Sequence, residues 1–120
     1  MTNFTQIFKP YDIVAVPFPF TNKDYTKKRP ALVISQEEYQ EQTHHCILAM
    51  ITSTKQSEWQ NDVSIQDLEG TGLPGSSIIR SKLFTLDERL ILRVLGTLSK
   101  RDRDAAKKML KRVFIDFSGA

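Results

Sequence analysis

The side chains of this chain that could do chemistry are arginine, threonine, serine and aspartate residues in predicted loops and at predicted strand ends. Its two histidines, His44 and His45, are adjacent, so in a strand they would point to opposite faces and could not easily bind one metal ion. The sequence contains no Cys-x-x-Cys pair, no His-x-x-x-His pair and no metal-binding triad of acids. It also lacks the glycine-rich patterns that bind nucleotide phosphates. We therefore expect no metal site and no cofactor.

The single cysteine, Cys46, lies in the apolar run 46–51. One cysteine excludes an internal disulfide. A catalytic thiol would have to stand in a predicted core strand, whereas a small buried hydrophobic residue is the simpler interpretation.

Several short runs have the composition of β-strands. Residues 11–18 are rich in β-branched and aromatic side chains, and residues 62–66 alternate as a half-buried strand does. The glycine and proline residues of 69–75 predict a loop, and Gly96 is expected to weaken the end of the last strand. The predicted strands are 11–18, 31–34, 46–51, 62–66, 77–80 and 90–98.

Serine or threonine followed three residues later by an acid predicts three helix starts. Ser35 with Glu38 and Thr85 with Glu88 resemble capping boxes for short helical turns. A third start at Ser99 precedes an apolar stripe that recurs every four residues, with lysine and arginine on the other faces. The stripe predicts a helix of about four turns. Its apolar residues are Ala105, Ala106, Met109, Leu110, Val113 and Phe114.

Strands this close together in the sequence leave no room for parallel crossovers, so the sheet should be mostly antiparallel. A length of 120 residues suits a single domain spanning 1–120. The predicted fold is α+β and mainly β: a small curled antiparallel β-barrel with a C-terminal amphipathic helix packed against it.

Charge is unevenly distributed along the chain. Residues 80–112 carry eleven Lys or Arg against four acids, whereas residues 30–79 carry one Lys against seven acids. The basic segment could attract a polyanion or an acidic peptide, or could be a solvated helix face. No apolar stretch reaches the ~18 residues of a membrane span, and the N-terminus does not resemble a signal peptide. We therefore expect a cytoplasmic protein without a membrane partner.

Five sequence blocks, in order, resemble the PemK/MazF family of toxins from type II toxin–antitoxin systems. The family pattern begins with Gly-Asp-Ile-Val, a loop, and Arg-Pro before an apolar strand that ends in Ser. Each block alone is weak, but their order and spacing are compatible with the family from about residue 10 to residue 112. The blocks are 12–35 (with Lys28-Arg29-Pro30), Ala49–Ser53 (with Ile51-Thr52-Ser53), Gly72–Ser77, Ser81–Asp87 and Leu95–Ser99.

This resemblance implies an endoribonuclease, an mRNA interferase, that cuts single-stranded RNA without a metal. The 2′-OH would attack the adjacent phosphorus and leave a 2′,3′-cyclic phosphate and a 5′-OH. The family's functional arginine maps onto Arg29, whose guanidinium can bind two phosphate oxygens. Without the resemblance, Arg29 would be read as part of a surface ion pair. The resemblance implies that the Thr52 hydroxyl donates a hydrogen bond to the negative charge that develops on the phosphate oxygens. Without it, Thr52 would be read as an ordinary threonine at the end of a strand.

The resemblance also implies a general base and an RNA-binding surface. Asp24 has the spacing of an acid that some family members carry five residues before the arginine, although it could equally be a turn residue. Phe20 could stack on a base or pack in the core. For Trp59 we expect packing against the sheet rather than base stacking. The predicted RNA-binding residues are Phe20, Lys27, Lys28, Ser53 and Lys82.

Two departures from the family pattern bear on these expectations. Tyr11 stands where most members have Gly, which questions a tight backbone approach at that point. Residues 82–85, Lys-Leu-Phe-Thr, replace Gln-Ile-Arg-Thr, which we interpret as a change of RNA preference. The alternatives are a CcdB-like gyrase poison, a barrel that binds nucleic acid or peptide without catalysis, and a member whose activity has decayed.

The family's partners are expected as well. Members work as homodimers, and an antitoxin occupies the RNA groove with an acidic, flexible segment. Basic residues around such a groove suit both the RNA and that segment.

Overall fold

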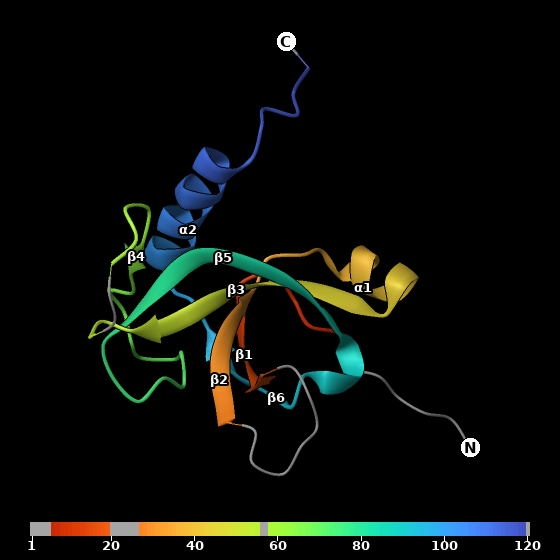
Figure 1. Ribbon diagram of the computed structural model, residues 1–120, viewed down its shortest axis with the longest axis horizontal. Helices are drawn as coiled ribbons and strands as arrows, with labels where there is room; N and C mark the ends of the chain where they lie inside the picture. The colour runs from red at the N-terminus through yellow and green to blue at the C-terminus, as the bar shows by residue number, and fades with distance from the viewer. Residues whose placement is uncertain (1–5, 20–26, 56–57, 120) are drawn as a thin grey trace.

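The computed structural model describes residues 6–19, 27–55 and 58–119 of the chain. Six strands form one antiparallel sheet in the order β4-β5-β3-β2-β1-β6 (Figure 1). The strong curl of the sheet confirms the predicted mainly-β, curled antiparallel fold. The strands are β1 (Asp12–Phe18), β2 (Lys27–Val33), β3 (His45–Ser53), β4 (Val63–Ser64), β5 (Ser77–Asp87) and β6 (Arg93–Thr97). The helices are α1 (Glu37–Thr43), the 3₁₀ turn η1 (Glu88–Leu90) and α2 (Lys100–Val113).

The apolar stretches 13–16 of β1, 31–33 of β2 and 46–51 of β3 are covered on both faces of the sheet, which explains why they are continuously apolar rather than alternating. On one face, Val14, Val33 and Leu48 pack with Phe8 and with Ile91, which follows η1. The neighbouring residues of the same strands point to the other face and pack against α2. Each fully buried aliphatic side chain contributes about 1.5–3 kcal/mol, so the sheet holds most of the core energy.

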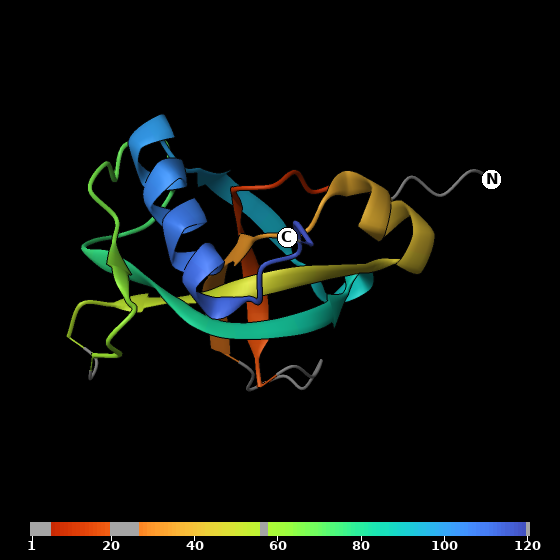
Figure 2. The ribbon, with the colours of Figure 1, turned by 90° about the horizontal axis from the view of Figure 1, so that it is seen from above.

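The C-terminal helix α2 confirms the predicted amphipathic helix and lies across one face of the sheet (Figure 2). Its N-cap is Ser99, whose hydroxyl accepts from the Asp102 amide at 3.2 Å. Ala106 and Met109 are fully buried against the sheet. The last turn of the predicted stripe is different, because Val113 and Phe114 are about half exposed at 41% and 46%.

Two predicted capping boxes are wrong. The Ser35 hydroxyl accepts from the Ile47 amide at 3.0 Å, and α1 begins after Gln36, which makes no side-chain cap. Thr85 lies inside β5, and Asp87 caps η1 instead by accepting from the Arg89 amide. In both cases the predicted cap residue, Ser35 or Thr85, interacts with strand β3 instead of capping a helix.

Strand boundaries also differ from the prediction. The segment 27–30, which lies outside the predicted strands, belongs to β2 because it pairs with residues 15–18 of β1. The predicted strand 62–66 shortens to Val63–Ser64. It ends there because the amides of Gln66 and Asp67 donate to the buried carboxylate of Asp102 rather than to a neighbouring strand.

Gly96 has a positive role rather than the weakening one predicted for it. A Cβ at this position would collide with the carbonyl oxygen of Gly70 and with Thr71. The loop that contains Gly70 therefore lies directly on β6, where the Thr97 amide donates to the Gly70 carbonyl at 2.9 Å. Only glycine permits this approach.

Tyr11 adopts a left-handed backbone conformation with φ of 74°. This conformation costs an L-residue roughly 1–2 kcal/mol and explains why the family pattern has glycine at the same point. Its ring lies under the Arg103 guanidinium at 5.4 Å and packs against the buried cluster beneath α2. These contacts offset the backbone cost, and the fold is kept.

Cys46 is buried in β3, as predicted. Burial, with the nearby Glu88 carboxylate adding to it, raises the pKa of its thiol to about 11, although a hydrogen bond with Ser35 acts in the opposite direction. The thiol is therefore protonated at neutral pH and serves as a core residue. No helix in the part of the chain that the structure describes is long and apolar enough to cross a membrane.

Candidate functional site

An open pocket of about 220 Å³ lies where strands β1, β2, β3 and β5 meet. Three of the predicted site residues, Arg29, Thr52 and Lys82, line it together. Among the described residues of the lining, three are cations and none is an acid, so the pocket is suited to an anion. Its described lining is Phe18, Arg29, Met50, Ile51, Thr52, Arg80 and Lys82.

The order of the strands explains why residues far apart in the sequence meet here. Because β2, β3 and β5 are neighbours, Arg29, Thr52 and Lys82 are carried on three adjacent strands. Arg29 lies opposite Val16 of β1, and Met50 lies opposite Ala31 of β2. Arg29 and Met50 therefore lie on the same face of the sheet as the buried residues Val16 and Ala31. Unlike those two residues, they line the open pocket.

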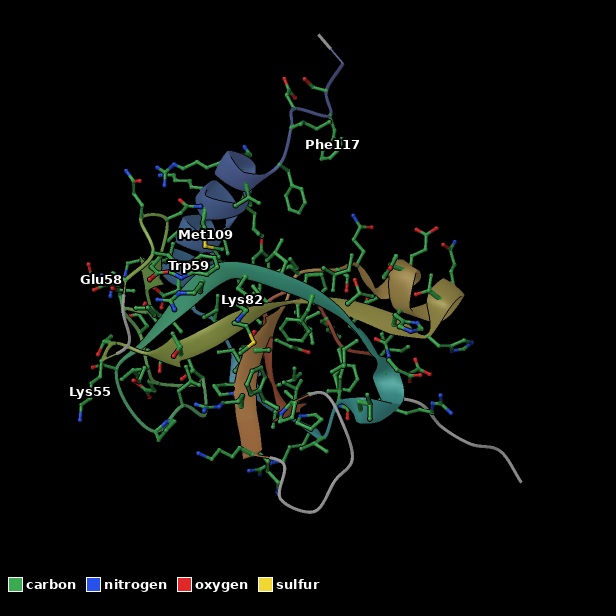
Figure 3. The ribbon with its side chains drawn as sticks, in the orientation of Figure 1. Lys55, Glu58, Trp59, Lys82, Met109 and Phe117 are labelled. Carbon is green, nitrogen blue, oxygen red and sulfur yellow. The ribbon has the colours of Figure 1, made fainter. Side chains whose placement is uncertain are left out.

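An irregularity in β5 shapes one wall of the pocket. Ala49 pairs with Leu83, and Ile51 pairs with Ile79, so residues 80–82 of β5 face Met50 alone. Such a bulge re-aims the side chains of the longer strand. Lys82 belongs to this longer stretch of β5 and lines the pocket (Figure 3).

Arg29 is exposed on β2, and its guanidinium carbon lies 6.0 Å from the centre of the Phe18 ring. Contact with the face of the Phe18 ring restricts the conformations of the Arg29 side chain and uses none of its N–H donors. Pro30 follows it and favours an extended backbone at Arg29. The guanidinium thus lies at the pocket, and within the described ranges no hydrogen bond ties it to another residue.

Thr52 and Ser53 point to opposite faces because they are successive residues of a strand. Thr52 is half-buried, lines the pocket and lies opposite Ile78 of β5. Ser53 is exposed, and its hydroxyl accepts from the Lys55 amide at 3.3 Å in the turn after β3. The described lining of the pocket includes Thr52 but not Ser53.

Arg80 is a pocket residue that the sequence did not single out. It binds Asp62 through two hydrogen bonds, Nε to Oδ1 at 3.1 Å and Nη2 to Oδ2 at 2.9 Å. Both side chains are nearly buried, with 11% and 9% exposed. The hydrogen bond from Arg80 holds the pKa of Asp62 below its usual value, so this pair stays charged at neutral pH.

A sequence feature could have revealed Arg80. It stands at the end of the predicted strand 77–80 and two residues before Lys82, and a regular extended backbone would put the two cations on one face. Its partner Asp62 lies 18 residues away, and no local pattern links the two.

Other predicted site residues lie elsewhere. Lys27 and Lys28 are exposed at the start of β2, opposite Phe18 and Pro17, and are not among the described lining residues. Phe20 and Asp24 lie outside the described residues. No group of three or more His, Cys, Asp or Glu side chains within 6–19, 27–55 and 58–119 could hold a metal ion.

Trp59, which we expected to pack against the sheet, does so only in part. Its side chain is 44% exposed, in the segment before β4, and the Arg80 guanidinium lies 5.1 Å from its ring centre. The alternating run that follows is only a two-residue strand, which leaves the tryptophan outside the core.

Comparison with known proteins places the chain in a sequence family and in a fold. The family model for the PemK-like, MazF-like toxin of type II toxin–antitoxin systems matches residues 9–114. No curated protein sequence matches the chain significantly.

Several solved structures share the fold at low sequence identity. MazF from Deinococcus radiodurans is 19% identical with a TM-score of 0.70, covering 90% of this chain and 96% of that one. The Mycobacterium tuberculosis toxin MazF-mt6 is 20% identical with a TM-score of 0.67, covering 88% and 99%. An endoribonuclease in complex with its cognate antitoxin, from a mycobacterial species, is 13% identical with a TM-score of 0.67, covering 87% and 91%.

Proposed function

This chain belongs to the family of PemK-like, MazF-like toxins of type II toxin–antitoxin systems, and we propose that it is an endoribonuclease that cuts single-stranded RNA. The observation that carries the proposal is the convergence of Arg29, Thr52 and Lys82 on one open, cationic pocket. The solved structures with the same fold include proteins described as endoribonucleases, which supports the same activity here.

The proposed reaction is an internal transfer at phosphorus. The 2′-oxygen of the RNA forms a bond to the adjacent phosphorus while the bond from that phosphorus to the 5′-oxygen breaks. The 2′-OH loses its proton, and the departing 5′-oxygen gains one. The products are a 2′,3′-cyclic phosphate and a 5′-OH, and the step needs positioning, charge stabilisation and proton transfer rather than a metal.

We assign the charge-stabilising roles to the residues that line the pocket. The Arg29 guanidinium would bind two non-bridging phosphate oxygens, because its planar fork of donors matches them. The Thr52 hydroxyl would donate to the charge that develops on them. Lys82 would bind phosphate as a point charge. Asp24 remains our proposed general base, with Lys27, Lys28, Ser53 and Phe20 as proposed RNA contacts around the site.

The function is tested by incubating the purified protein, free of antitoxin, with a long single-stranded RNA in EDTA and mapping the 5′ ends. We expect discrete fragments with 5′-OH ends at one short sequence motif. Cleavage that stops in EDTA would refute the metal-independent mechanism. Intact RNA from folded protein would refute the enzyme and favour a CcdB-like gyrase poison or a non-catalytic binding barrel.

Lys82 is expected to set sequence preference, because it lines the pocket where many family members have a neutral glutamine. We predict that Lys82→Gln still cleaves RNA but at a different set of sites, with total activity reduced by less than about tenfold. The check is to map the 5′ ends of one RNA after digestion by each protein. An unchanged fragment pattern would contradict this role. Phe84, which stands where the family pattern has an arginine, packs against the buried cluster instead.

We also propose that a cognate antitoxin covers this pocket with an acidic, flexible segment and that the toxin forms a homodimer. The cationic lining supports the first part, since carboxylates can bind where phosphates would. Solved structures of the same fold include complexes of MazF with MazE, which supports it further. Light scattering after gel filtration tests the dimer. We propose the cytoplasm as the location, because the RNA substrate is there.

A further inference from the structure

Trp59 is fixed in position although nearly half of its side chain is exposed. Its amide donates to Asp62 Oδ2 at 2.8 Å, and the Asp62 amide donates back to the Trp59 carbonyl at 3.1 Å. Asp62 also holds the Arg80 guanidinium, which lies over the Trp59 ring. The same carboxylate therefore orients both the backbone of the tryptophan and the cation stacked on its ring. A large aromatic held this rigidly in the open is arranged to receive a partner.

The exposed ring borders a second, larger hollow of about 640 Å³ next to the first pocket. Two contacts join the hollows. Arg80 lines the first and is paired with Asp62 of the second, and Thr52 of the first lies opposite Ile78 of the second. In the view of Figure 3, Trp59 lies between Lys82 and Glu58. A chain bound at the first pocket would therefore continue over Trp59.

The two hollows differ in charge. The described lining of the first contains three cations and no acid. The described lining of the second contains no cation: its acids are Glu58 and Asp62, the latter already paired with Arg80, and its other polar groups are uncharged. A phosphate is attracted to the first and repelled from the second. A nucleobase, which is uncharged and has a flat π-face with hydrogen-bonding edges, suits the second.

From these observations we infer that Trp59, with Arg80 behind it, is the stacking platform for a nucleobase adjacent to the phosphate held in the first pocket. Glu58 and Gln60 at the rim supply hydrogen-bonding groups for the edge of that base. Trp59 is then a binding and specificity residue, not a catalytic one. The inference rests on the proposed function, because it takes single-stranded RNA as the ligand.

Trp59 is the only tryptophan in the chain, so intrinsic fluorescence reports on this residue alone. The probe is a single-stranded oligonucleotide with 2′-O-methyl groups, which cannot be cut, carrying the cleavage motif mapped above, or random sequence if none is found. We expect saturable quenching of Trp59 fluorescence, and much weaker quenching by an oligonucleotide with the same phosphates but an abasic site at the stacked position. Unchanged fluorescence at concentrations that saturate binding by anisotropy would overturn the inference.

Steady-state cleavage by variants gives a second, independent test. For Trp59→Ala we expect KM to rise about tenfold or more with kcat changed less than threefold, since stacking acts mainly on binding. Trp59→Phe should recover most of the loss. The matched control is Phe117→Ala, because Phe117 is an aromatic residue, 77% exposed, on the segment beyond α2 (Figure 3). Kinetics of Trp59→Ala indistinguishable from those of Phe117→Ala would overturn the platform.

The two tests separate this inference from the function on which it rests. Efficient cleavage, with no quenching of Trp59 fluorescence and no change in KM for Trp59→Ala, refutes the platform and leaves the proposed endoribonuclease activity standing. Quenching by the oligonucleotide without any cleavage refutes the enzyme and supports the platform as part of a binding site. If Trp59→Ala does not fold, as judged by circular dichroism, fluorescence of the unmodified protein decides alone.

Discussion

Arg29→Ala is expected to lower the rate of RNA cleavage at least a hundredfold while leaving the fold intact. A preorganised donor aimed at developing charge is typically worth about 10²–10³ in rate. The Arg29 side chain is exposed, and its contact with the Phe18 ring is at the edge of the range for a cation–π interaction, so its removal should change stability little. The measurement is kcat/KM on an RNA with one cleavage site, with circular dichroism as the check of folding.

Two further variants sharpen this result. Arg29→Lys keeps the charge but loses the fork of donors, so we expect an activity between those of the alanine variant and the unmodified protein. Arg93→Ala is the matched control, because Arg93 is also an exposed arginine on a strand of the same sheet. It lies opposite Ala15, on the other face of the sheet from Arg29. Unmodified activity in Arg29→Ala would reject the assignment of this residue.

Asp102→Ala is expected to lower the free energy of unfolding by about 2–5 kcal/mol. The carboxylate is fully buried and accepts the amides of Gln66 and Asp67, each at 2.9 Å, together with the Ser99 hydroxyl at 3.3 Å. Without it, two part-buried amides lose their acceptor, and each such loss costs up to about 1–3 kcal/mol. This is a large share of the ~5–15 kcal/mol that holds a domain together.

Urea denaturation followed by circular dichroism measures the effect. Asp104→Ala is the control, since Asp104 is an exposed acid two residues further along the same helix. We expect this control to change stability by less than about 0.5 kcal/mol. Equal stability of the two variants would show that the buried carboxylate does not tie α2 to the segment after β4.

The candidate site was partly predictable. The family-like sequence blocks and the predicted strand ends pointed to Arg29, Thr52 and Lys82. The structure brings all three to one pocket. The roles of Arg80 and Trp59 were not predicted, because both depend on Asp62. This carboxylate accepts from the Trp59 amide within a turn and from the Arg80 guanidinium, which lies 18 residues further along the chain. Ser53 followed Thr52 in the motif, but strand alternation turns its side chain to the opposite face.

The sequence by itself determined the elements whose stability is local. The helix α2 was predicted from its four-residue apolar period and its Ser99 cap, since both act within one or two turns. The strands β1 and β3 were predicted from the clustering of β-branched and apolar residues.

Only the tertiary structure decided the features that depend on pairing between distant segments. The basic segment 27–30 has little intrinsic preference for a strand and becomes one because β1 lies beside it. Likewise Ser35 leaves its predicted cap because the Ile47 amide needs an acceptor in the interior. The pocket arises for the same reason. Strand order and the irregular register of β5 place Arg29 together with the distant Arg80 and Lys82, and no short-range pattern encodes a long-range register.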